Sequence, residues 1–215
     1  MSEALLRTEI VETARAMSRA GLSPGRSGNV SARWGAGMLI TPSGMPYEAI
    51  AADDVAYVGR GGEPRPGERA PSSEWRFHLA IYTAKPDVNA VVHCHSIAAT
   101  ALACLRLAVP PFHYMVTAAG GHDVRLAPYA TFGTPELADG VVTALDGRLA
   151  CLMANHGQTA CGATLRAALE LAETVEALAA QYIAARAIGE PHLLSAEEMD
   201  AAVEQFKNYG QPARG

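Results

Sequence analysis

A hairpin pattern near the N-terminus restricts the fold of this chain more than any other feature of its sequence. Val30–Trp34 alternates like a strand with one solvated face, and Gly37–Thr41 repeats the strand pattern after a tight-turn signal at Gly35-Ala36-Gly37. Strands joined by so short a turn pair antiparallel. Strand and helix patterns then alternate along the chain, so we expect a largely antiparallel sheet between layers of helices.

The remaining elements follow from apolar spacing and from residues that begin or end helices. Ser2 is the expected cap of the first helix, and a serine cap with Glu74 in the first turn is expected to open the second. The stretch from Val109 to Thr134, with its proline and glycine pairs, is expected to be mostly loop. The predicted helices span 2–21, 71–84, 98–105, 134–146, 163–188 and 195–207, and the predicted strands span 30–34, 37–41, 55–58, 89–95, 149–153 and 158–161.

Composition excludes several classes of protein. A chain of 215 residues, 49% of them apolar, suits one large domain with a buried core, and its net charge of -5 argues against non-specific nucleic-acid binding. Met1–Leu5 does not begin an export signal and no apolar run is long enough for a membrane span, so we expect neither export nor membrane insertion. Scattered cysteines indicate reduced thiols in a cytoplasm, although Cys151 and Cys161 could face each other across a hairpin.

The candidate chemistry centres on Val91-Val92-His93-Cys94-His95-Ser96, where an apolar strand ends in two histidines. Residues two apart on a strand leave from the same face, so both imidazoles can hold one metal ion while Cys94 points away. The pair does not define a metal site by itself, because backbone carbonyls could satisfy both rings instead.

Two further residues could complete a metal site. His156 stands where a second apolar strand reaches polar residues, and Glu74 precedes the strand that carries the histidine pair. A catalytic zinc site uses three protein ligands and an open position, which His93, His95 and His156 can supply. Glu74 could be a fourth ligand and general base, or only a carboxylate paired with a helix dipole, and His156 could be structural.

Three loops have the composition of a phosphate site. Glycines let backbone amides approach a ligand, hydroxyls can donate, and a helix N-terminus attracts an anion. Neither a Walker lysine motif nor GxGxxG is present, so a nucleotide is not indicated, and three ordinary turns would have the same composition. The candidate phosphate-binding residues are Gly28, Asn29, Ser43, Gly44, Ser72 and Ser73.

Eight short motifs are spread over nearly the whole chain. They are Gly28-Asn29-Val30-Ser31, Thr41-Pro42-Ser43-Gly44, Ser72-Ser73-Glu74-Trp75-Arg76-Phe77-His78, Val91-Val92-His93-Cys94-His95, His113-Tyr114-Met115, Ala118-Ala119-Gly120-Gly121, Ala127-Pro128-Tyr129-Ala130-Thr131-Phe132-Gly133 and His156-Gly157. In this order they resemble the class II aldolase/adducin family, and most of all its bacterial members that act on L-fuculose 1-phosphate. The resemblance implies one three-layer α/β/α domain over 1–215, assembled as a homotetramer with active sites between subunits.

The resemblance also assigns roles to the candidate ligands. His93, His95 and His156 would hold Zn²⁺, or Mn²⁺, Co²⁺ or Fe²⁺ in its place, with Glu74 as a movable fourth ligand and the catalytic acid/base. The glycine and hydroxyl loops would hold the phosphate of the substrate.

The same resemblance directs several aromatic residues to a neighbouring subunit. Tyr114 and Tyr209 would reach the aldehyde side of that subunit's site, and Phe132 and Phe206 would shape its wall. The C-terminal tail, about 207–215, would thereby complete a site that belongs partly to another copy of the chain.

The activity implied is reversible cleavage of a ketose 1-phosphate to dihydroxyacetone phosphate and an aldehyde. The substrate would be L-fuculose 1-phosphate or a 5-deoxy- or 5-methylthio-pentulose 1-phosphate. Alternatives on the same fold are a methylthioribulose-1-phosphate dehydratase, a sugar-phosphate epimerase and a non-catalytic adducin-like binding module. The epimerases carry aspartate where this chain has Glu74, and a binding module would not need the metal and base residues.

Overall fold

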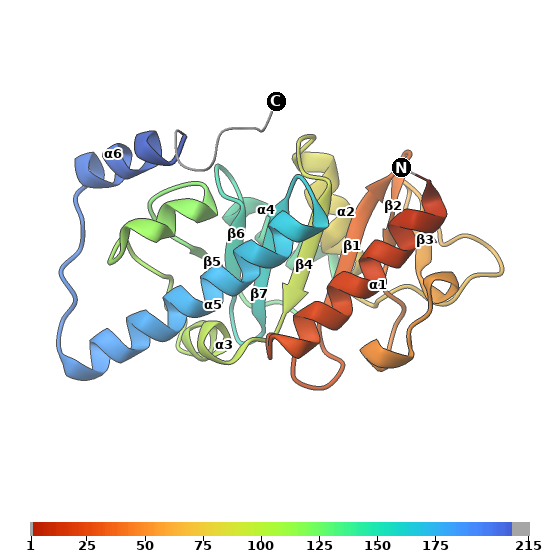
Figure 1. Cartoon of the computed structure of the whole chain (residues 1–215), viewed down its shortest axis with the longest axis horizontal. Coiled ribbons are helices and arrows are strands. Elements are labelled where there is room, and N and C mark those ends of the chain that lie inside the picture. Colours follow the sequence, from red (N-terminus) through yellow and green to blue (C-terminus); the bar gives the residue numbers. More distant parts are fainter. Residues whose placement is uncertain (1, 208–215) are drawn as a thin grey trace, which may run out of the picture.

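The computed structural model describes residues 2–207, which form a seven-stranded sheet flanked by helices (Figure 1). The order of the strands in the sheet is β3-β2-β1-β4-β7-β6-β5. The helices are α1 (Glu3–Arg19), α2 (Trp75–Ala84), α3 (Ile97–Cys104), α4 (Pro135–Ala144), α5 (Leu165–Ile188) and α6 (Ala196–Lys207), and the strands are β1 (Asn29–Trp34), β2 (Gly37–Ile40), β3 (Ala56–Val58), β4 (Ala90–Cys94), β5 (Arg125–Ala127), β6 (Ala150–Met153) and β7 (Gly157–Gly162).

The predicted hairpin is the start of this sheet. Strands β1 and β2 pair antiparallel with Ala32 opposite Leu39, and β1 then pairs with β4, which continues to β7 and β6. Only the β5–β6 pair of the named strands is parallel. The α/β class and the largely antiparallel sheet are therefore confirmed.

Helices cover both faces of the sheet, which places β4 in the middle of the core. Figure 1 shows α1 and α5 crossing in front of the sheet, with α2 and α4 behind it. Val92 and Cys94 pack with residues of α1, α3 and α5, whereas Val91 packs with residues of α2 and α4. A strand buried on both faces is apolar at successive positions. The alternation leaves His93 on the α2 side, where its ring meets Phe77 edge-on with centroids 5.3 Å apart.

The start of α2 differs from the prediction. The helix begins at Trp75, so Glu74 occupies the cap position and not the first turn. The hydroxyl oxygen of Ser72 accepts a hydrogen bond from the Glu74 N–H at 3.3 Å, and the Glu74 side chain caps nothing. The expected capping serine thus turns the chain before the helix, and the Glu74 carboxylate can face the sheet.

The stretch over 109–134 is mostly loop, as predicted, but it also contains two short elements that the sequence did not indicate. Tyr114–Ala119 forms a 3-10 helix, and β5 adds an edge strand of three residues, too short to show an alternating pattern. The same region supports α6, since His122 pairs with Asp200 at 2.9 Å. This stretch is therefore a scaffold for the C-terminal helix as well as a connection.

The four cysteines are free thiols, as expected, so Cys151 and Cys161 are not bonded to each other. None of the helices that the structure describes combines the length and the apolar composition that crossing a membrane requires.

Candidate active site

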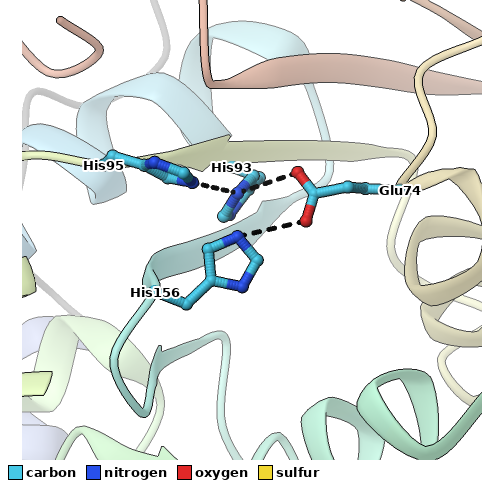
Figure 2. A group of neighbouring side chains, drawn as sticks. All are labelled: Glu74, His93, His95 and His156. Carbon is cyan, nitrogen blue, oxygen red and sulfur yellow. Dashed lines mark hydrogen bonds and ion pairs between the residues drawn. The ribbon is translucent and has the colours of Figure 1, made fainter. Parts of the chain in front are cut away.

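The four predicted metal ligands converge at one end of the central strands (Figure 2). His93 is the next-to-last residue of β4 and His95 follows its end. His156 lies in the tight turn between β6 and β7, and Glu74 is the residue directly before α2. One ligand atom from each residue lies within 4.8 Å of all the others. We call these residues the metal-site cluster.

Short contacts connect the ligand atoms. The Nε2 atoms of His93 and His95 lie 3.1 Å apart, and the two oxygens of Glu74 reach different histidines. Glu74 Oε2 is 3.2 Å from His93 Nε2, and Glu74 Oε1 is 3.1 Å from His156 Nε2. All of these atoms therefore face one common point.

The donor set fits a divalent metal ion. Three imidazole nitrogens and one carboxylate are the ligands that Zn²⁺ takes in tetrahedral sites. Glu74 Oε1 is buried, and its contact with His156 Nε2 at 3.1 Å is not a well-aligned hydrogen bond, so a bound cation would offset the cost, about 1–3 kcal/mol, of an unsatisfied buried acceptor. His93 Nδ1 donates to the Gln158 carbonyl at 2.8 Å, an outer hydrogen bond that orients Nε2 toward the cluster.

The protonation states of the cluster also suit a metal. Burial, with the nearby His93 and His156, lowers the pKa of His95 to about 3, so its ring is neutral and can offer a lone pair. Burial opposes ionisation of Glu74, but the close contacts with His93 and His156 outweigh burial and hold the pKa of Glu74 well below the usual range. Glu74 therefore offers a carboxylate and His95 a neutral nitrogen.

A hollow of about 340 Å³ opens beside the cluster, and we call it the active-site hollow. All six residues predicted to hold a phosphate line it, together with Glu74, His95, His156 and Phe132. Two loops meet there because Arg26 Nη1 donates to the Gly44 carbonyl at 3.0 Å. Gly44 has a φ of +71°, and a Cβ on Gly28 would lie 2.6 Å from the His93 carbonyl oxygen, so both positions require glycine.

Two of the predicted aromatic site residues that the structure describes do not line this hollow. Tyr114 stacks on Phe206 with ring centroids 6.0 Å apart, and both border a separate hollow beside Met115. Tyr209 lies outside the described residues. That these residues serve a neighbouring subunit's site therefore stays a prediction.

Sequence reasoning assigned no role in metal or phosphate binding to several residues that line the hollow, among them Arg26, Tyr129 and Asn155. Asn155 has a φ of +55° in the turn that delivers His156, a conformation that asparagine tolerates better than most residues. Its position directly before the histidine was the available signal. Arg26 lies within the loop-forming run that precedes Gly28, and no local pattern distinguishes it.

Comparison with known proteins identifies the family. The chain matches the family described as Class II Aldolase and Adducin N-terminal domain over residues 8–183, and it belongs to that family. It is 48% identical to the 5-methylthioribulose-1-phosphate/5-deoxyribulose-1-phosphate aldolase of Rhodospirillum rubrum, over 99% of this chain and 96% of that protein. It is 47% identical to the L-fuculose phosphate aldolase of Escherichia coli, over 95% of each.

Solved structures lead to the same family. An L-fuculose 1-phosphate aldolase superposes with a TM-score of 0.92 at 40% identity, covering 96% of this chain and 98% of that one. The chain is thus a class II aldolase-family enzyme, a lyase, and the family together with the cluster implies a bound metal. The expected likeness to bacterial L-fuculose-phosphate enzymes is confirmed.

Proposed function

We propose that the chain is a zinc-dependent aldolase that reversibly cleaves a ketose 1-phosphate to dihydroxyacetone phosphate and an aldehyde. The observation that carries the proposal is that the metal-site cluster lies directly beside loops rich in glycine and hydroxyl donors. A phosphorylated ketose needs both features, because its phosphate must be held while its carbonyl meets the metal.

The phosphate would bind where the loops meet the start of α2. Ser43 and Ser73 offer hydroxyls, Gly44 offers a backbone N–H, and the N-terminus of α2 adds a favourable dipole. Arg26 is the only lysine or arginine among the described residues that line the hollow, and it adds a positive charge for the dianion. Asn29 and Ser72 are the remaining donors that we assign to this group.

The chemistry at the carbon atoms would be divided between the metal and this chain's side chains. When bound, the metal supplies a Lewis acid that stabilises the negative charge developing as the C3–C4 bond breaks. Glu74 gives a proton to C3 in cleavage and removes one in condensation. None of the described residues lining the hollow is a lysine, so the hollow has no amine for a Schiff base.

The C4 hydroxyl must lose its proton as the aldehyde forms. We assign this step to Tyr114 of a neighbouring subunit, or to a water that it orients, with Tyr209 as its companion on the aldehyde side. Phe132, and Phe206 of the neighbour, would form the apolar wall. This arrangement requires the homotetramer that the family resemblance predicts. A single domain over 1–215 and a cytoplasmic location likewise stay predictions.

The physiological aldehyde is a separate question. Relatives named for L-fuculose phosphate and for 5-methylthioribulose or 5-deoxyribulose 1-phosphate match this chain at 47% and 48% identity. We propose that the substrate is one of these ketose 1-phosphates. Tyr129, Ala130 and Phe132 line one side of the hollow and would contact the part of the sugar that differs among them.

A coupled assay for dihydroxyacetone phosphate tests the proposal. Zinc-loaded enzyme is offered the 1-phosphates of L-fuculose, L-rhamnulose, D-ribulose, 5-deoxyribulose and 5-methylthioribulose, with Glu74→Gln as the inactive reference. We expect release that depends on Glu74, and the order of kcat/KM values identifies the aldehyde. No release from any substrate would reject the aldolase and direct the search to dehydratase or epimerase assays.

A further inference from the structure

A line of buried hydrogen bonds extends from Glu74 into the core, away from the metal-site cluster. Asn29 Nδ2 donates to Glu74 Oε2 at 2.9 Å, and Asn29 Oδ1 lies 2.5 Å from His78 Nε2. Ser31 Oγ lies 2.7 Å from His78 Nδ1 and 2.8 Å from the Tyr82 hydroxyl. All five residues are buried, with at most 5% of their surface exposed. We call this arrangement the polar line.

Two elements build the polar line by their own periodicities. Strand β1 contributes Asn29 and Ser31, which are two residues apart and so share a face. Helix α2 contributes His78 and Tyr82, which lie four and eight residues after Glu74 and so follow one stripe. The side chains on this stripe of α2 contact those on this face of β1.

The charge of Glu74 determines the direction of every hydrogen bond in the line. An ionised carboxylate only accepts, so the Asn29 NH₂ group must face Glu74 and the Asn29 oxygen must face His78. His78 Nε2 therefore carries a hydrogen and donates. Its Nδ1 must then accept from Ser31, which in turn accepts from Tyr82.

His78 can serve in this way because its ring stays neutral. The residue is fully buried, and burial lowers the pKa of His78 to about 3. A neutral imidazole has one donor and one acceptor, and the polar line uses both. The Asn29 amide is left with one N–H, the one that can still face the active-site hollow.

We propose that His78 is a positioning residue for the acid/base step: by holding the Asn29 oxygen, it orients the amide that fixes Glu74. The proposal rests on the proposed role of Glu74 as acid/base. Without the His78 donor, the Asn29 amide can rotate, and Glu74 Oε2 loses the N–H that Asn29 donates to it. His78 touches no substrate, so its effect should fall mainly on proton transfer and only weakly on phosphate binding, to which Asn29 contributes one of several donors.

Exchange of the carbon-bound hydrogen of dihydroxyacetone phosphate in heavy water isolates this step. The C–H bond breaks, Glu74 takes the proton, and a deuteron returns to the same carbon, with no aldehyde required. In the wild type, the His78 ring stacks on Phe77 with ring centroids 4.4 Å apart. His78→Phe keeps an aromatic ring at this position but removes both nitrogens. His78→Gln restores an amide N–H near the Nε2 position, and Thr83→Ala on the exposed side of α2 is the matched control.

We expect His78→Phe in the metal-loaded enzyme to lower both the exchange rate and the cleavage kcat by about 10–100-fold. KM and bound metal should stay within about twofold of wild type, and His78→Gln should recover most of the loss. Ser31→Ala, which removes the donor to Nδ1, should cost less, and it replaces His78→Phe if that variant does not fold. Thr83→Ala should match wild type.

Several results would overturn the proposal. Unchanged exchange in His78→Phe would do so, and equal losses in His78→Phe and His78→Gln would assign His78 to packing alone. Heteronuclear NMR of the histidine rings gives a readout that is independent of activity. We expect the neutral Nε2–H tautomer of His78, and finding the Nδ1–H tautomer would contradict the proposal. Wild-type enzyme without exchange or cleavage would instead reject the proposed function.

Discussion

The two sides of the active-site hollow are built in different ways. On the metal side, His93 is fully buried and Glu74 is 5% exposed, and both have hydrogen-bonding partners from neighbouring strands. What we call the exposed side is formed by Tyr129 and Phe132, which also line the hollow and are 56% and 63% exposed. Tyr114, which the family resemblance directs to an aldehyde pocket, is 51% exposed and lies outside the hollow.

This difference follows from what burial demands of polar and apolar groups. A buried carboxylate or imidazole without partners is costly, so the folded chain supplies those partners itself. An exposed aromatic ring has no such requirement and takes its final surroundings from whatever covers it. We infer that one subunit organises the proton and metal chemistry, and that contact between subunits completes the pocket that selects the aldehyde.

The largest effect should come from the buried side. Glu74→Gln keeps the three histidines but removes the acid/base, and kcat should fall by about 10³-fold because general acid/base catalysis contributes on that order. The measurement is kcat in the coupled assay, alongside metal content by elemental analysis. Glu12→Gln, an exposed change on α1, is the control. A Glu74→Gln enzyme with near wild-type kcat would remove Glu74 from the mechanism.

A smaller loss is expected from the exposed side. Tyr114→Phe removes only a hydroxyl, and kcat should fall about 100-fold if that group helps to move the C4 proton. The free energy of unfolding should change by less than about 0.5 kcal/mol, because the side chain is exposed in the subunit. Urea denaturation measures stability, and Tyr57→Phe on β3 serves as the comparison. Equal kcat values for the two variants would leave the aldehyde side without its proposed residue.

The phosphate loops should respond through binding. Ser43→Ala removes one hydroxyl donor, and KM should rise about 10-fold with a smaller change in kcat, since a hydrogen bond to a charged group contributes about 1.5–3 kcal/mol. The inhibition constant of inorganic phosphate should rise in parallel. If KM rises while inhibition by phosphate is unchanged, Ser43 contacts another part of the substrate.

The smallest expected effect is on stability and comes from Glu3, which lies outside the active-site hollow. Glu3 accepts hydrogen bonds from Arg65 and Arg7, and the Arg65 contact above all lowers the pKa of Glu3 to about 2. The folded state therefore binds this proton more weakly than the unfolded state. The contribution to stability is present above the ordinary pKa of 4.5 and is lost as pH falls toward about 2.

Glu3→Gln should accordingly weaken this pH dependence, by about 1 kcal/mol or less for a partly exposed ion pair. Urea denaturation at several pH values between about 2 and 5 gives the comparison with wild type. The two proteins should converge in stability at the acid end. Parallel curves would show that Glu3 titrates alike in the folded and unfolded chain.

Local pattern was sufficient for much of the candidate site. The histidine pair shares a face because strand side chains alternate, and that geometry is local to His93–His95. The turn between Trp34 and Gly37 likewise predicted the hairpin of β1 and β2. These features depend on neighbours within a few residues.

Other features depended on contacts between distant parts of the chain. Strand β5 has only three residues and forms by pairing with β6. Glu74 precedes α2 instead of lying in its first turn, and its carboxylate contacts His93 and His156. A three-residue strand is too short to show an alternating pattern, and a carboxylate near a helix start fits either a position in the first turn or one before the helix. Strand pairing decided the first case, and burial of the carboxylate among the histidines decided the second.

The sequence by itself determined the family, the antiparallel hairpin and the identity of the metal-site cluster, because motif order and strand periodicity are properties of the chain alone. Only the tertiary structure decided which carboxylate oxygen faces which histidine, and that Asn29 lies between Glu74 and His78. Hydrogen bonds from β1 to Glu74 and to α2 join residues 45 to 51 positions apart. Their direction depends on a charge buried by folding, which no local pattern contains.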